Sequence, residues 1–70
     1  MNTVEITTES IRLDQALKLA GITGTGGESK YLIQEGLVSV NQEEELRRGR
    51  KLHDKDIVEV QGDVFQIKRV

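Results

Sequence analysis

Cysteine, proline and tryptophan are absent from this 70-residue chain, and histidine occurs once. Without cysteine no disulfide can form, and one histidine is too few for a structural zinc site, which needs several Cys or His ligands. A domain of this size buries about 60% of its unfolded surface, so its stability must come from a thin apolar core. We expect one domain spanning residues 1–70, with no metal and no cofactor.

Long apolar runs are also absent. No uninterrupted apolar stretch exceeds three residues, whereas a membrane-spanning helix needs roughly 20. The N-terminal MNTVEITTES does not contain the basic segment and apolar run of a signal peptide. The absence of cysteine gives no sign of an oxidising compartment. We therefore expect a cytoplasmic protein that does not bind membranes.

Aromatic side chains are scarce, because the chain has only Tyr31 and Phe65. Protein modules that read single-stranded RNA stack successive bases on several aromatic rings. Reading of a single strand by base stacking is therefore not expected.

Charge is unevenly distributed along the chain, although the net charge is only −2. Residues 1–45 hold three bases and eight acids, and residues 56–70 have a net charge of −1. By contrast, residues 46–55 (LRRGRKLHDK) hold five bases and one acid. Such a concentrated basic patch can bind polyanions, while the acidic remainder limits promiscuous binding.

Apolar spacing predicts a first helix over about residues 11–20. Ser10 is the expected N-cap, and Gly21 suits the position just past the end. The residues that share one apolar face are Leu13, Ala16, Leu17 and Ala20.

A second helix is predicted over about residues 26–35. Thr25 and Glu28 have the spacing of a capping box, and Gly36 is the expected end. The helical spacing is carried by Ser29, Leu32 and Ile33. The short glycine-rich link to the first helix favours an antiparallel or angled helix pair.

The remaining segments alternate apolar and polar residues, as strands do. Strands are expected near residues 3–7, 37–41, 57–60 and 64–68, with turns at Asn41-Gln42 and at residues 61–63. The polar stretch 43–53 should contribute only Leu46 and Leu52 to the core. The residues expected to be buried together are Leu13, Leu17, Leu32, Ile33, Val38 and Val58. The pattern is β-α-α followed by three or four short strands.

Three constellations could suggest other chemistry. GITGTGGESK lacks the third glycine of a dinucleotide loop and the Gly-Lys-Ser/Thr of a P-loop, so a turn and helix cap explain it better. His53 beside Asp54 has no evident nucleophile and is expected at the surface. The run 43–45 (EEE) lacks the spacing of a calcium loop, so a solvated turn is expected there.

The basic cluster is the strongest functional feature of the sequence. Arginine presents a planar fork that binds phosphate oxygens in pairs, and Gly49 allows a close backbone approach. The cluster comprises Arg47, Arg48, Arg50 and Lys51. Its charges could equally pair with the nearby glutamates in a solvated hairpin.

Residues 11–60 resemble the S4 RNA-binding domain, also called the alpha-L motif. The resemblance is carried by three segments in this order: IRLDQALKLAGI, ESKYLIQEGLVSVN and KDIVEV. GGESK and RRGRKL look more specifically like its short, free-standing bacterial YaaA/YbcJ type. The matching positions are Arg12-Leu13-Asp14, Lys30, Leu32-Ile33, Gly36, Val38, Val40, Asn41 and Asp56-Ile57-Val58.

The resemblance implies an α+β fold, the alpha-L motif, with two helices packed on a small antiparallel β-sheet. RNA would lie across the second helix and the adjoining basic loop, with Arg12 and Lys30 contacting phosphates. Gly26 and Gly27 would leave the first N–H groups of that helix open to a phosphate. The family's usual Ser-Arg pair falls on Thr25-Gly26, so one expected arginine contact is missing. The family's Asn-Gly turn reads Asn41-Gln42.

We therefore expect a non-catalytic, monomeric module that binds structured RNA, with ribosomal RNA as its target. The predicted RNA-binding residues are Arg12, Gly26, Gly27, Lys30, Arg47, Arg48, Arg50 and Lys51. The alternative is a protein-interaction adaptor whose basic loop docks on an acidic protein partner.

Overall fold

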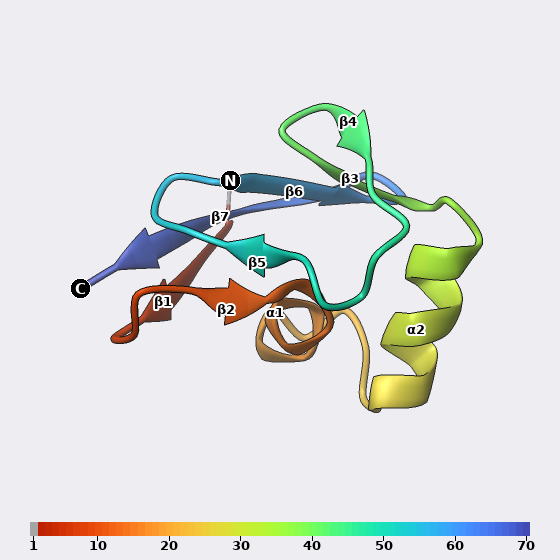
Figure 1. Ribbon diagram of the computed structural model, residues 1–70, viewed down its shortest axis with the longest axis horizontal. Coiled ribbons are helices and arrows are strands. Elements are labelled where there is room, and N and C mark those ends of the chain that lie inside the picture. The colour runs from red at the N-terminus through yellow and green to blue at the C-terminus, as the bar shows by residue number, and fades with distance from the viewer. Residues whose placement is uncertain (1) are drawn as a thin grey trace.

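The computed structural model describes residues 2–70, so Met1, the first residue of the predicted domain, lies outside the described residues. The elements in chain order are β1 (Asn2–Ile6), β2 (Ile11–Arg12), α1 (Leu13–Leu19), α2 (Gly26–Gln34), β3 (Val38–Val40), β4 (Glu43–Glu44), β5 (Lys51–Leu52), β6 (Ile57–Val60) and β7 (Asp63–Arg69) (Figure 1). The predicted strand, the two helices and the three later strands are present in the predicted order, but β2, β4 and β5 are not among the predicted strands, and five strands rather than three or four follow α2. No helix within residues 2–70 has the length and apolar character needed to cross a membrane.

The main sheet has five strands in the order β1-β7-β6-β3-β4, and β2 pairs with β5 separately. All neighbours in the main sheet are antiparallel except β1 and β7, which run parallel. The expectation of a purely antiparallel sheet is therefore wrong at this edge. Almost the whole chain separates β1 from β7, so no hairpin turn forces them to be antiparallel.

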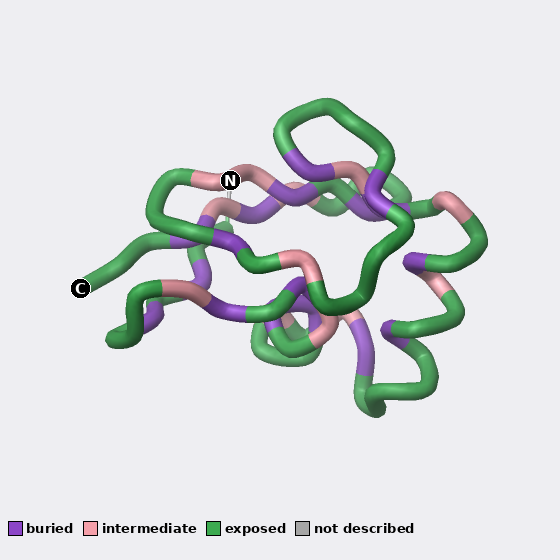
Figure 2. Tube along the Cα trace, in the orientation of Figure 1, coloured by how far each residue is buried: buried purple, intermediate pink, exposed green. Residues whose placement is uncertain are grey.

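The core lies between the main sheet on one side and α1, α2 and the β2–β5 pair on the other (Figures 1 and 2). Five of the six predicted core residues are fully buried, and Leu32 is partly buried. Leu52 is buried as predicted, whereas Leu46 is 54% exposed. Successive side chains of an extended chain point in opposite directions, and here Glu45 points inward, so Leu46 points outward.

Helix α1 begins later than predicted, and Ser10 is not its N-cap. Arg12 occupies the cap position without a side-chain cap bond. Instead, the N–H of Leu13 donates to the carbonyl of Arg50 at 2.8 Å, and the N–H of Asp14 donates to that of Arg48 at 3.1 Å. A distant loop therefore satisfies the first N–H groups of the helix, which otherwise have no partner.

Helix α2 has the predicted cap. The Thr25 hydroxyl accepts from the Glu28 N–H at 3.1 Å, while the Glu28 carboxylate accepts from the Gly24 N–H at 3.0 Å. The reciprocal bond thus falls one residue before its expected position. Gly36 has φ +76°, which glycine tolerates, and the helix ends just before it as predicted.

The two helices meet at Ser29, a small polar residue that is fully buried. Its hydroxyl pairs with that of Thr23 at 2.7 Å and donates to the carbonyl of Asp14 at 3.2 Å. The small side chain lets α2 approach α1 closely, and its polar group has partners in the interior.

Two tight turns organise the sheet. Asn41 and Gln42 have φ of 52° and 72° and join β3 to β4, so the predicted turn is confirmed. The segment expected as a solvated turn thereby provides strand β4. Gln61 and Gly62, with φ of 49° and 91°, join β6 to β7, and Asp63 already belongs to the strand.

Candidate nucleic-acid interface

Residues 45–51, here called the basic loop, are organised around the carboxylate of Glu45. This side chain is only 8% exposed. Its Oε2 accepts from the backbone N–H and the Nε of Arg47, both at 3.1 Å, and its Oε1 accepts from Nη1 of Arg50 at 2.8 Å. The prediction that residues 43–45 form a solvated turn is wrong for Glu45, whose buried carboxylate accepts hydrogen bonds from two arginines of the loop.

The charge of Glu45 is held by these bonds. Hydrogen bonds from Arg47, and then from Arg50, lower the pKa of Glu45 from 4.5 to about 2, although burial acts in the opposite direction. The same contact raises the pKa of Arg47. Glu45 is therefore ionised at neutral pH and offsets part of the loop's positive charge.

The basic loop is also fixed to the start of α1. The carbonyls of Arg48 and Arg50 accept the first N–H groups of the helix, and β5 then pairs with β2. In this pair Arg12 lies opposite Lys51, while Ile11 lies opposite Leu52. Since the latter two face the core, Arg12 and Lys51 share the outer face. Arg12 also pairs with Asp14 at 2.9 Å.

Helix α2 and the basic loop both contact Asp14 of α1. The N–H of Asp14 donates to Arg48, and its carbonyl accepts from Ser29, so both segments contact one residue of α1. Lys30 follows Ser29 and is exposed. Within residues 2–70, neither Lys30, Arg48 nor Lys51 forms an ion pair. Their charges are available to a ligand.

The predicted cluster therefore divides into two kinds of residue. Arg50 and Arg47 bond to Glu45, although Arg47 is still 76% exposed. Lys30, Arg48 and Lys51 form no ion pair within residues 2–70, whereas Arg12 is half exposed and pairs with Asp14. The sequence does not distinguish the two kinds, because the inward orientation of Glu45 follows from long-range packing.

Gly26 and Gly27 open helix α2 and leave its end uncovered. A Cβ at Gly26 would meet nothing within 4 Å, and one at Gly27 would meet only the Thr25 hydroxyl at 3.9 Å. Their N–H groups make no hydrogen bond with another residue in the described chain. An anion could approach this helix end, but the cap residue Glu28 adds a negative charge beside it.

His53 and Asp54, which are neighbours in the sequence, take part in separate hydrogen bonds. His53 is exposed, and its backbone N–H donates to the Asp56 carboxylate at 2.8 Å. Asp54 accepts from the backbone N–H of Arg69 at 2.8 Å. No three metal-binding side chains lie together within residues 2–70.

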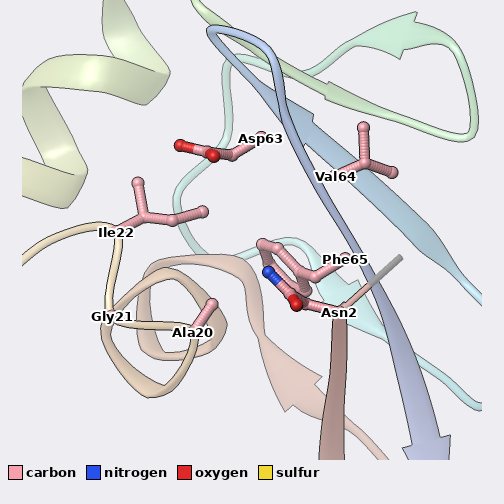
Figure 3. A pocket seen from close by; sticks show the side chains of 7 residues that line it. All are labelled: Asn2, Ala20, Gly21, Ile22, Asp63, Val64 and Phe65. Atoms are coloured by element: carbon pink, nitrogen blue, oxygen red, sulfur yellow. The ribbon is translucent and has the colours of Figure 1, made fainter.

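A pocket of about 250 Å³ lies where the chain leaving α1 passes β7 (Figure 3). Asp63 points into it toward Ile22 and is its only charged lining residue. Among its described lining residues, Asp63 is accompanied by no nucleophilic side chain and no second acid. The lining residues are Asn2, Ala20, Gly21, Ile22, Asp63, Val64 and Phe65.

The model of the S4 domain family matches residues 4–68. This chain belongs to the S4 domain family. The probable ribosome maturation protein RlbA of Bacillus subtilis (strain 168) is 48% identical over 61 residues, which are 87% of this chain and 86% of RlbA. The resemblance drawn from the sequence is confirmed.

Solved S4-like structures agree with this assignment. The solution structure of YbcJ from E. coli, described as revealing an alpha-L motif involved in RNA-binding, is 29% identical with a TM-score of 0.76. The match covers 97% of this chain and 87% of YbcJ. The 30S ribosomal protein S4e of Thermoplasma acidophilum shares the fold, with a TM-score of 0.65 at 19% identity over 84% of this chain and 31% of that protein. The alpha-L fold predicted from the sequence is confirmed.

Proposed function

We propose that this S4 domain is a non-catalytic, cytoplasmic and monomeric module that binds structured RNA, with ribosomal RNA as its target. RlbA is named for ribosome maturation, and the motif of YbcJ is described as involved in RNA-binding. The similarity to both proteins supports the same class of ligand for this chain.

Phosphate groups are the proposed points of contact. Four basic side chains would bind phosphates of a folded RNA: Arg48, Lys51, Lys30 and Arg12. A further phosphate would approach the N–H groups of Gly26 and Gly27. Arg47 and Arg50, which bond to Glu45, would contribute mainly through the shape of the loop and its remaining positive potential. Affinity would come from charge and shape complementarity, as is usual for double-stranded RNA.

The observation that carries this proposal is the fixed conformation of the basic loop. The buried carboxylate of Glu45 accepts hydrogen bonds from Arg47 and Arg50 of the loop. The backbone carbonyls of residues 48 and 50 accept hydrogen bonds from the first N–H groups of α1. A loop that is already ordered loses little conformational entropy on binding. The backbone positions that carry its cations are therefore fixed before binding.

Crosslinking in cells, followed by sequencing of the bound RNA, tests the proposal. We expect ribosomal RNA to dominate the recovered reads and the double variant Arg48→Glu/Lys51→Glu to lose them. The matched control is Lys68→Glu, an exposed residue of β7 opposite Glu5 of β1. Recovery of proteins but no RNA would instead support the adaptor whose basic loop docks on an acidic partner.

A further inference from the structure

We infer that the groove beside Tyr31, between α2, the link that precedes it and the β6–β7 turn, holds a single unpaired nucleobase of the bound RNA, an inference that rests on the proposed RNA-binding function. The groove has a volume of about 450 Å³. It is lined by Ile22, Thr23, Gly27, Glu28, Tyr31, Leu32 and Gln61.

The lining has the parts needed to hold a base. Tyr31 is 62% exposed, so its ring is accessible to a ligand, while Ile22 and Leu32 are partly buried apolar neighbours. One base stacked on one aromatic ring does not require the multiple platforms of single-strand readers. Gly27 borders the groove one helical turn before Tyr31. A nucleotide could place its base against Tyr31 while its phosphate lies outside the groove.

The negative charge around the groove favours a base over a phosphate as its occupant. No Lys or Arg lines it, whereas Glu28 does, and Asp63 points toward Ile22 from the adjoining pocket (Figure 3). These acids repel a phosphate. Oε1 of Glu28 accepts from Gly24, and Oε2 has no partner within residues 2–70. The free oxygen can accept from the amino group of a base.

Gln61 adds the complementary polar group and occupies an unfavourable backbone position. Its φ of 49° suits glycine, asparagine or aspartate better than glutamine, yet this residue lines the groove. The Gln61 amide has both a donor and an acceptor. Together with Glu28 it matches the Watson–Crick edge of adenine or cytosine, where an amino donor lies next to a ring-nitrogen acceptor, and not that of uracil, which has no amino group.

The test compares three RNA hairpins with one stem: fully paired, with one bulged adenine, and with one bulged uracil. We expect the bulged-adenine hairpin to bind about tenfold more tightly than the paired stem, as stacking on one aromatic ring allows. It should also bind more tightly than the bulged-uracil hairpin, because uracil has no amino group to donate to Glu28. Tyr31 is the only tyrosine and there is no tryptophan. Quenching of tyrosine fluorescence by the bulged hairpin, and not by the paired one, would therefore report stacking at this position.

Variants separate this site from the phosphate surface. Tyr31→Ala should abolish the preference for the bulge and retain affinity for the paired stem, while Tyr31→Phe should keep the preference. Gln61→Gly should raise the melting temperature and lose the preference for adenine over uracil. Arg48→Glu should weaken binding to all three hairpins.

Two results would overturn the inference. Equal affinity for the paired and bulged hairpins, unchanged in Tyr31→Ala, would leave the proposed RNA-binding function standing and remove the base site. Failure to bind any of the hairpins would overturn both.

Discussion

The carboxylate of Glu45 orders the basic loop, because it binds two of the arginines whose positive charges would otherwise repel one another. Glu45→Gln keeps the shape of the side chain but removes the charge that binds Arg47 and Arg50. We expect the free energy of unfolding at pH 7 to fall by about 2 kcal/mol, less than for a fully buried pair because water reaches Arg47. Urea unfolding monitored by circular dichroism measures this change.

The effect of Glu45→Gln should also depend on pH. Because the folded-state pKa of Glu45 is about 2, below its ordinary 4.5, the stabilisation is fully present above pH 4.5 and is lost as pH falls toward 2. The difference between wild type and variant should therefore shrink over that window. Glu43→Gln, at an exposed residue of β4, is the matched control and should change stability little. A difference independent of pH would contradict the ionic role of Glu45.

Gln42 occupies a backbone conformation suited to glycine. With φ of 72° in a two-residue turn, Gln42→Gly should relieve strain and raise the free energy of unfolding by roughly 0.5–1 kcal/mol. Gln15→Gly, the same substitution at an exposed position of α1, should instead lower stability by about 1 kcal/mol. Thermal melts of the two variants check these opposite signs, and a loss in both would contradict the turn assignment.

At the scale of elements, a glycine stands near each end of α2, and replacing the two by alanine should have opposite effects on stability. Gly26 has open space around it, so Gly26→Ala should raise stability by about 0.5–1 kcal/mol through helix propensity. The same added methyl would cover the helix end and should weaken binding to a folded RNA. Melting curves together with RNA titrations measure the two effects.

Gly36→Ala provides the contrast to Gly26→Ala. At this position φ is +76°, and a Cβ would lie 2.8 Å from the Glu44 carboxylate, so stability should fall. Gain of stability with no loss of RNA affinity in Gly26→Ala would remove the start of α2 from the proposed interface.

Local sequence signals predicted the elements whose partners lie nearby. Thr25 with Glu28, the Asn41-Gln42 turn and Gly36 each act within a few residues, and each is confirmed. The start of α1 was misplaced because its N–H groups bond to carbonyls of residues 48 and 50, far along the chain. Sequence spacing cannot reveal such a cap.

For the molecule as a whole, the sequence predicted the alpha-L fold and the basic cluster, but not which charges the fold neutralises. The inward orientation of Glu45 and the exposure of Leu46 arise together from packing of an extended segment against β3, whose Val38 carbonyl accepts the Glu45 N–H at 3.0 Å. The parallel pairing of β1 with β7 similarly joins the two ends of the described chain. The long-range contacts that decide these features leave no local pattern.

The distribution of charge over the whole molecule determines how variants should be chosen. Arg50→Glu would place a second carboxylate beside Glu45, so it would disturb the loop as well as any RNA contact. Arg48 is exposed, forms no ion pair within residues 2–70 and contributes its backbone carbonyl to α1. Arg48→Glu therefore changes surface charge while preserving the backbone cap.

The central claim, that the basic loop binds RNA phosphates, is tested most directly by a salt series. The affinity for a folded ribosomal RNA fragment is measured at each salt concentration for wild type, Arg48→Glu and Lys68→Glu. If about four phosphates are neutralised, the slope of log K against log salt should be about −3 for wild type. Arg48→Glu should bind more weakly with a slope shallower by about 1, and Lys68→Glu should match wild type. Equal affinity and slope for wild type and Arg48→Glu would contradict phosphate binding by the basic loop.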